Sequence, residues 1–86
     1  MNPTVATVHA VAPHRLRVRF SNGEVRLFDV SPLLHLGVFR QLRDAARFQA
    51  VRAVAGSVEW PGGIDLSYDT LYVDGVPEVL TPSVDR

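Results

Sequence analysis

Arginine side chains recur at alternate positions in one short segment of the chain. Arg15, Arg17 and Arg19 are separated by single apolar residues in the run RLRVRF. A guanidinium group donates two parallel hydrogen bonds to a carboxylate or a phosphate, so a row of such groups is suited to binding anions. Residues two apart lie on the same face of a β-strand. The spacing therefore predicts a cationic strand face whose chemistry is the binding of an anion or an acidic partner.

The element that must position this face is a β-hairpin. Alternation over residues 15–20 is typical of a half-buried strand, and a second strand is expected at 25–30. Asn22-Gly23 between them favours a two-residue turn, which fixes the register and sets Arg19 opposite Arg26. The side expected to be buried consists of Leu16, Val18, Phe20, Val25 and Leu27. The opposite side, the candidate partner-binding face, consists of Arg15, Arg17, Arg19, Arg26 and Phe28.

Two interpretations of this face stay open at the level of the sequence. Arginines directly opposite one another are destabilising, so something should compensate for their repulsion. In the first interpretation, the arginine stems cover Phe28 and a neighbouring strand or the C-terminal tail supplies carboxylates. In the second, the face binds an acidic protein or, as the alternative function, the phosphates of a nucleic acid. The formal net charge is zero, which disfavours strong non-specific binding to nucleic acid.

A second candidate feature is the tetrapeptide Trp60-Pro61-Gly62-Gly63. One interpretation is a core tryptophan that leads into a tight turn. The other is an exposed tryptophan that anchors a partner, because paired glycines allow a ligand or a partner backbone to approach closely. Asp65 could close this turn or pair with an arginine. The candidate turn or anchor residues are Trp60, Gly62, Gly63 and Asp65.

Residue types that usually carry catalysis are sparse. Cysteine and lysine are absent, which removes thiolate chemistry, disulfides and Schiff-base lysines. His9, His14 and His35 match no zinc-binding spacing. Asp65 and Asp69 could form a carboxylate pair for acid–base work or for a divalent cation, although Asp69 is also placed to cap a helix. We therefore expect no enzymatic activity, no catalytic residue, no metal site, no cofactor and no small-molecule substrate.

Length and composition restrict the class of protein. The 86 residues, 47% of them hydrophobic, fit one small domain, expected over residues 1–80 with a frayed tail at 81–86. The N-terminal residues lack the charged start and the apolar run of a signal peptide. No segment approaches the roughly 20 apolar residues that span a bilayer. Cytoplasmic residence without a membrane partner is the expectation.

Short elements are expected along the rest of the chain. They are a strand at 4–12, helical segments at 31–36, 38–42 and 45–51, strand pieces at 52–55, 58–60 and 64–66, and a last helical turn through Leu71 and Tyr72. The segments at 38–42 and 45–51 could instead form one kinked helix. Gly37 is expected to end the first helical turn, Asp44 to cap the segment at 45–51, and Ser67 or Asp69 to cap the last turn. Pro77 restricts the apolar residues 76–80 to an edge strand or an extended arm. These elements predict an α+β fold. In it, a small antiparallel meander of three N-terminal strands with an Asn-Gly hairpin packs against two or three short helices, with further short strands toward the C-terminus.

An ordered set of residues resembles one small bacterial family. The set is Gly37-Val38-Phe39, Leu42, Asp44, Phe48, Val58-x-Trp60-Pro61-x-Gly63-x-Asp65-Leu66 and Asp69-x-Leu71-Tyr72. With the preceding hairpin, it is similar to the domain of unknown function 2442 family over roughly residues 5 to 72. The resemblance implies a small α+β domain with an antiparallel meander on short helices. It supplies no catalytic residues, because none are established for the family.

Two arrangements among the relatives suggest roles. Some relatives are fused to a helix-turn-helix, which is not found here, so reading of the major groove is not transferred. Others sit beside a second small protein in what looks like a toxin–antitoxin pair. We therefore expect a non-enzymatic interaction or regulatory module with a protein partner or a homodimer, and weak nucleic-acid binding as the alternative. The C-terminal arm with Val76, Val79 and Leu80 could add a strand to a partner or pair across a dimer.

Overall fold

The alternating run of arginines and apolar residues forms an inner strand of a four-stranded antiparallel sheet. The computed structural model describes residues 1–78 and gives this sheet the order β1-β2-β3-β7. Its strands are β1 (Val5–Val11), β2 (Arg15–Phe20), β3 (Val25–Asp29) and β7 (Val76–Pro77). Pro77 lies in the edge strand, as expected, because proline has no N–H for a sheet ladder. The predicted tail at 81–86, together with Val79 and Leu80 of the predicted arm, lies outside the described residues.

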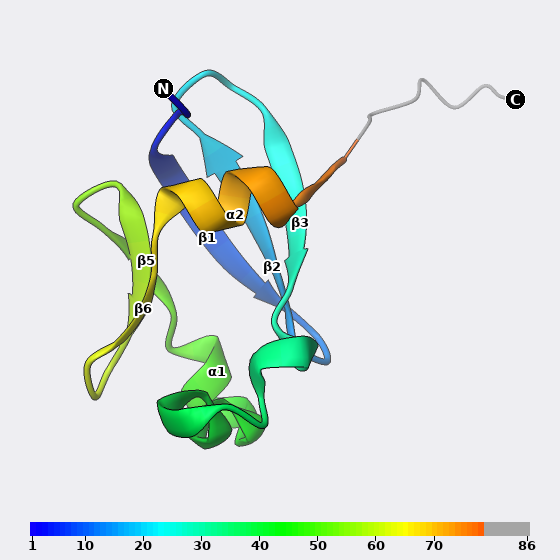
Figure 1. The fold of residues 1–86 in the computed structure, drawn as a ribbon, viewed down its shortest axis with the longest axis vertical. Helices are drawn as coiled ribbons and strands as arrows, with labels where there is room; N and C mark the ends of the chain where they lie inside the picture. Colours follow the sequence, from blue (N-terminus) through cyan, green and yellow to red (C-terminus); the bar gives the residue numbers. More distant parts are fainter. Residues whose placement is uncertain (79–86) are drawn as a thin grey trace, which may run out of the picture.

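A second antiparallel sheet stands next to β1 (Figure 1). It has the order β4-β5-β6, with strands β4 (Arg52–Val54), β5 (Ser57–Trp60) and β6 (Ile64–Leu66). The amide of Val5 donates a hydrogen bond to the carbonyl of Gly56 at 2.8 Å and so links the two sheets. Ala55 and Gly56 form the turn between β4 and β5, and their φ angles are 52° and 83°.

Four short helical segments complete the fold. They are the 3₁₀ helices η1 (Ser31–Leu33) and η2 (Gly37–Arg43) and the α-helices α1 (Ala45–Gln49) and α2 (Tyr68–Asp74). Asp44 starts α1 by accepting a hydrogen bond from the amide of Arg47 at 3.0 Å, and Ser67, rather than Asp69, caps α2. The prediction that Gly37 ends a helical turn was wrong, since Gly37 is the first residue of η2.

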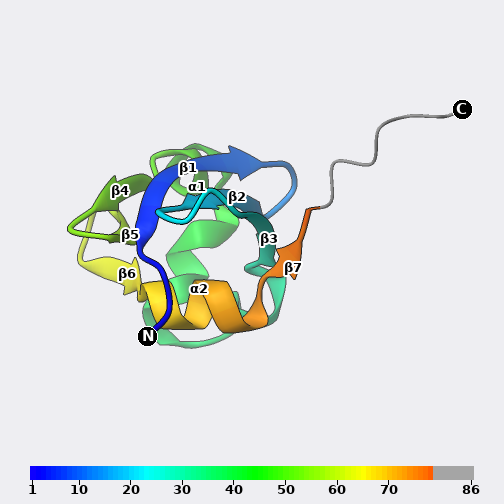
Figure 2. The same cartoon turned by 90° about the horizontal axis from the view of Figure 1, so that it is seen from above.

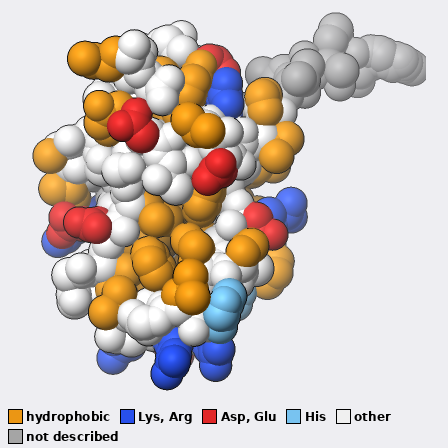
Figure 3. All heavy atoms as spheres, viewed as in Figure 1, with side chains coloured by type: hydrophobic (Ala, Val, Ile, Leu, Met, Phe, Trp, Pro, Cys, Tyr) orange, Lys and Arg blue, Asp and Glu red, His pale blue; other side chains and the backbone are white. Residues whose placement is uncertain are grey.

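These segments cover one side and one end of the sheets. Figures 1 and 2 show α2 lying across one face of the four-stranded sheet, while η2 and α1 close the end away from the N-terminus. On this side of the molecule, Figure 3 shows a band of apolar side chains between α2 and the helical end. Cationic side chains gather at the helical end, below this band. The predicted α+β fold is confirmed.

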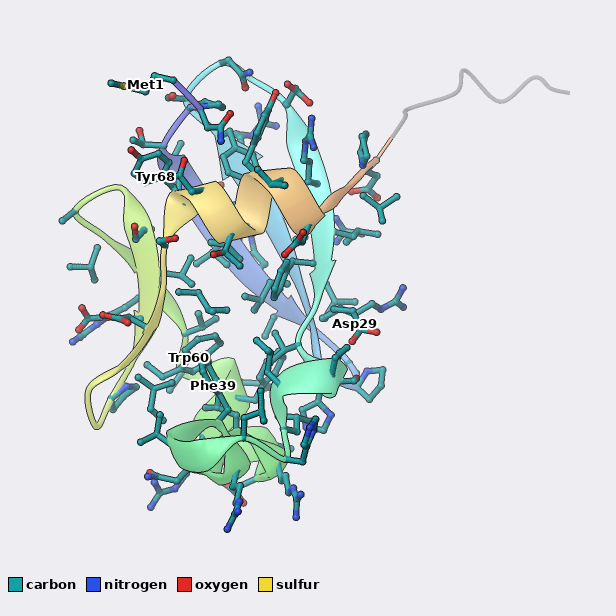
Figure 4. The ribbon with its side chains drawn as sticks, in the orientation of Figure 1. Met1, Asp29, Phe39, Trp60 and Tyr68 are labelled. Atoms are coloured by element: carbon teal, nitrogen blue, oxygen red, sulfur yellow. The ribbon has the colours of Figure 1, made fainter. Side chains whose placement is uncertain are left out.

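The core lies between the α2-covered face, the second sheet and the helical end. Every layer contributes fully buried side chains, among them Leu16, Val18, Phe20, Val30, Leu42, Phe48, Val58, Trp60, Ile64 and Leu71. The Nε1 atom of Trp60 donates a hydrogen bond to the carbonyl of Phe48 in α1 at 2.9 Å. Figure 4 shows Trp60 between the second sheet and the helical end that contains Phe39. Trp60 therefore joins the second sheet to the helical end of the molecule.

The hairpin between β2 and β3 differs from the predicted one. The amide of Gly23 donates to the carbonyl of Phe20 at 2.9 Å and the amide of Phe20 donates to the carbonyl of Glu24 at 2.8 Å, so the loop has three residues. Within it only Gly23 has a positive φ, of 90°. The pairing is therefore shifted by one residue, and Arg26 lies opposite Val18 instead of Arg19.

This shift changes which side chains share a face. Because side chains alternate along a strand, moving β3 by one residue turns its whole set over. The prediction that Arg26 and Phe28 share a face with Arg15, Arg17 and Arg19 was wrong. Arg26 and Phe28 lie on the α2-covered face, and Phe28 is buried at 5% exposure. Val25 and Leu27, predicted to be buried with the core, lie instead on the opposite side, which we call the outer face.

Candidate functional site

The centre of the outer face is formed by Arg15, Arg17 and Arg19, which we call the arginine row. Their side chains are exposed because the alternate residues of β2 point into the core. Across β1 their partners are Val11, His9 and Thr7, in that order. Across β3 their partners are Asp29, Leu27 and Val25. The row is therefore flanked by aliphatic side chains, a threonine and the imidazole of His9, with one carboxylate at its end.

Arg17, in the middle of the row, binds a carboxylate from the C-terminal edge of the sheet. Its Nε and Nη2 atoms donate to Oε1 and Oε2 of Glu78 at 2.9 and 3.2 Å, a two-pronged contact. The side chains are 46% and 29% exposed, so the pair is accessible to solvent. The hydrogen bond from Arg17, together with its charge, lowers the pKa of Glu78, and the same contact raises the pKa of Arg17. The contact shows that the row accommodates a carboxylate.

The two outer members of the row differ from Arg17. Arg15 lies opposite Asp29, whose Oδ1 atom accepts a hydrogen bond from the amide of Ser31 at 2.9 Å. That bond is the main cause of the lowered pKa of Asp29, and the charge of Arg15 is a lesser one. Figure 4 shows Asp29 at the end of β3, beside η1. Within residues 1–78, neither Arg15 nor Arg19 forms an ion pair.

Shallow hollows lie on both sides of the arginine row. One is lined by Arg17, Arg19, Gly23, Val25 and Glu78. The other is lined by Thr7, His9, Arg17, Arg19 and Val25. Both hollows are lined by Arg17 and Arg19, so they adjoin one another along the arginine row. Val25 gives both hollows an apolar wall.

Arg26 has the opposite environment. Together with Glu24, Tyr72 and Asn22 it forms a hydrogen-bonded group that we call the inner network. The side chain of Arg26 is only 17% exposed, and its guanidinium donates to Oε1 of Glu24 at 2.9 and 3.1 Å. It also donates to the carbonyl of Tyr72 at 2.6 Å and lies 3.8 Å from the centroid of the Tyr72 ring. These contacts satisfy a carbonyl near the C-terminus of α2, where a cation is favourable. Arg26 therefore holds α2 on the sheet and is not available to a partner.

Glu24 completes the inner network. The hydroxyl of Tyr72 donates to Oε2 of Glu24 at 2.5 Å, and the side-chain amide of Asn22 donates to the same oxygen at 3.0 Å. The hydrogen bond from Tyr72 is the largest cause of the lowered pKa of Glu24, followed by the bond from Arg26. This network was not predicted from the sequence, because the predicted register placed Arg26 on the other face. The available signal was the pair Glu24 and Arg26, which are two residues apart and so share a strand face.

The Trp60 turn is a structural feature. Trp60 is 1% exposed, which excludes the interpretation of an exposed anchor and supports the core interpretation. Gly62 and Gly63 have φ angles of 99° and 81°, a conformation that explains two consecutive glycines in this turn. Asp65 lies on the exposed side of β6, opposite Glu59, and does not close the turn. The structure therefore does not combine these four residues into one surface site.

The remaining candidate groups lie apart from one another. Asp69 accepts a hydrogen bond from the side chain of Asn2 at 3.1 Å. His14 packs edge-on against Phe48 with ring centroids 5.2 Å apart. Among residues 1–78, no three side chains of His, Asp or Glu are grouped so that they could hold a metal ion. In the same part of the chain, no helix has the length and apolar character needed to cross a membrane.

A known family model covers most of the chain. The family model described as "Protein of unknown function (DUF2442)" matches residues 5–76. The chain belongs to the DUF2442 family. The matched DUF2442 region contains the arginine row and the inner network, while Glu78 lies just beyond it. No curated protein and no solved structure matches the chain. Membership confirms the resemblance seen in the sequence, and the family's description assigns no role.

Proposed function

We propose that this DUF2442 chain is a non-enzymatic interaction module that binds a protein partner through its outer face. The observation that carries the proposal is the arginine row: three exposed guanidinium groups on one strand, of which only Arg17 forms an ion pair within residues 1–78. Exposed charges without partners are free to form charge-assisted hydrogen bonds with another molecule. The cytoplasmic location expected from the sequence is part of this proposal.

The composition of the outer face favours a protein over a nucleic acid. Asp29 and Glu78 lie on the same face as the row and would repel phosphates. Val25 and Leu27 are half-buried beside the arginines, and Val76 is 66% exposed in the edge strand. Arginine next to apolar side chains is typical of protein interfaces. A net charge of zero also gives no long-range attraction for a polyanion.

The environments of the polar residues support a non-enzymatic role. Ser67 and Asp44 start helices, Glu24 is held by Tyr72 and Arg26, and Asp69 contacts Asn2. Each of these groups is engaged in a local structural contact, instead of converging with others on one hollow. As a narrower form of the proposal, the partner is a second small protein, and the chain acts as the antitoxin-like half of the pair.

The test compares two charge reversals in the full chain. Arg19→Glu alters the outer face, and Arg40→Glu makes the same change in net charge at an exposed residue of η2, at the helical end. Tagged chains are recovered from the native host after crosslinking, with and without nuclease, and the retained proteins are quantified. We expect a partner that the unchanged chain and Arg40→Glu retain and that Arg19→Glu loses by about tenfold. Equal retention by both variants would overturn the proposal, and nuclease-sensitive retention would favour the nucleic-acid alternative.

A further inference from the structure

The contact between Glu78 and the arginine row has a specific geometry. The amide of Glu78 donates to the carbonyl of Val25 at 2.9 Å, so Glu78 lies beside Val25 at the edge of the sheet. The strand partner of Val25 in β2 is Arg19. The Glu78 carboxylate nevertheless binds Arg17, one step further along the row. The contact is therefore diagonal across β3.

The same diagonal contact between an edge residue and an arginine of β2 can be repeated along the edge, because side chains of a strand return to the same face every two residues. Alternate residues of any extended strand are about 7 Å apart, which equals the spacing of the arginines. An acidic residue at the position of Val76 would be directed at Arg15 by the same diagonal. One placed two positions after Glu78 would be directed at Arg19. In this sequence those two positions are Val76 and Leu80, which carry no charge.

The strand that now occupies this edge is short. β7 has two residues, and one of them is Pro77, which cannot donate a hydrogen bond to β3. β3 has five residues, and the ladder pairs Arg26 and Leu27 with β7. A longer strand without proline would therefore form more hydrogen bonds along the β3 edge than β7 does. Addition of a strand to an exposed sheet edge is a common way to bind an extended peptide.

We infer that the β3 edge and the arginine row together bind an extended acidic segment of the partner, with Glu or Asp at three alternate positions, and that Glu78 occupies one of these carboxylate positions in the free protein. This inference rests on the proposed function and names the chemistry of the partner. Glu78 is then a competitor: it keeps Arg17 paired until a partner strand with matching carboxylates replaces it. Charge complementarity supports this occupant, because the row offers three cations and the chain supplies a carboxylate to one of them.

The experiment measures peptide binding to the full chain by fluorescence anisotropy. The probe is the blocked peptide Thr-Glu-Val-Glu-Val-Glu-Thr. A peptide of the same composition with contiguous acids, Thr-Val-Glu-Glu-Glu-Val-Thr, is the matched control. We expect the alternating peptide to bind more tightly than the contiguous one. Arg17→Gln or Arg19→Gln should weaken binding by about tenfold, and Arg40→Gln should leave it unchanged.

The decisive variant is Glu78→Gln, which removes the competing carboxylate and so frees Arg17. It should tighten binding of the alternating peptide by about two- to fivefold, as expected for removal of an exposed competing ion pair. Equal binding of the two peptides, or no gain in Glu78→Gln, would overturn the inference. Tighter binding of a short oligothymidylate than of either peptide would also overturn it, in favour of a nucleic acid. If a native partner still depends on Arg19 while the two peptides bind equally, the proposed function survives and this inference fails.

Discussion

Arginines on two neighbouring strands of one sheet have opposite environments in this protein. Arg26 on β3 points toward α2, is 17% exposed, and donates to Glu24 and to the Tyr72 carbonyl. Arg19 on β2 points away from α2, is exposed, and forms no ion pair within residues 1–78. The residue type is the same, and the face of the sheet decides its use. A buried charge must be fully paired to be tolerated, whereas an exposed one can remain available to a partner.

The two regions also differ in the number of groups that donate hydrogen bonds to their carboxylates. Glu24 receives hydrogen bonds from Asn22, Arg26 and Tyr72, and the Tyr72 ring packs edge-on against Phe20 in the core. The Glu78 carboxylate receives hydrogen bonds from Arg17 alone among the described residues, and Glu78 directly follows the two-residue edge strand β7. The inner network is thus tied to the core, while the outer pair is accessible to solvent. Four substitutions test this contrast, from the largest expected effect to the smallest.

The largest effect is expected for Arg26→Ala. It leaves the Glu24 carboxylate and the Tyr72 carbonyl without their cationic donor in a partly buried setting. Stability should fall by about 2 kcal/mol, within the range for removal of one member of a charged hydrogen-bonded group. Urea unfolding followed by circular dichroism measures this loss. A change as small as that of an exposed arginine would show that the inner network does not stabilise the fold.

A smaller loss, of about 1 kcal/mol, is expected for Gly23→Ala, because an L-residue is strained at a positive φ. The φ of Gly23 is 90°, and this residue closes the loop that assigns Arg26 and the arginine row to different faces. Gly23→Asn should cost less, since asparagine tolerates this region better than alanine. Unfolding midpoints of the two variants give the comparison, and an equal, negligible loss in both would contradict the three-residue loop.

The third prediction concerns acid stability. The folded-state pKa of Glu24 lies below its unfolded value of about 4.3, so the unfolded state binds more protons in acid. The stability that this shift contributes is present above the unfolded-state pKa of Glu24, and it is lost as the pH falls through the folded-state pKa of Glu24. Tyr72→Phe removes the largest cause of the shift and should make the decline between about pH 5 and pH 3 shallower. Urea unfolding across this range measures the slope, and an unchanged slope would argue against the hydrogen bond from Tyr72.

The smallest effect on stability is expected for Arg19→Ala. The side chain is exposed and without an ion pair in the described part of the chain, so the change in unfolding free energy should stay below about 0.5 kcal/mol. The same unfolding assay applies, with Arg26→Ala as the matched substitution on the other face. A loss comparable to that of Arg26→Ala would show that the arginine row is structural, and would remove the contrast between the two faces.

Much of the fold could be predicted from local patterns. The strand at Arg15–Phe20 was predicted with its observed bounds, because strict alternation over six residues has only one simple interpretation. Asp44 and Ser67 were predicted helix caps, since a short polar side chain before a helical segment satisfies its free amides. Family membership also followed from the ordered set of residues between Gly37 and Tyr72.

The candidate site was predicted only in part. Arg15, Arg17 and Arg19 share a face because their spacing alone requires it. Arg26 and Phe28 were placed with them because Asn22-Gly23 was assigned a two-residue loop. A two-residue loop with two positive φ angles does occur in this chain, but at Ala55-Gly56, where the sequence gives a weaker signal. An Asn-Gly pair is compatible with either loop length, so the loop residues by themselves could not choose the register.

The sequence by itself determined the alternation within β2, the helix caps, the edge position of Pro77 and the absence of thiol and lysine chemistry, because each depends on residues close together in the chain. Only the tertiary structure decided the register of β3 and hence the face of Arg26. The pairing with Phe28 inside and Arg26 beneath α2 gains core packing and contacts to Glu24, Tyr72 and Gly75. Tyr72 and Gly75 lie more than forty residues away in sequence, as the separations of 46 and 49 show, so no local pattern could include them.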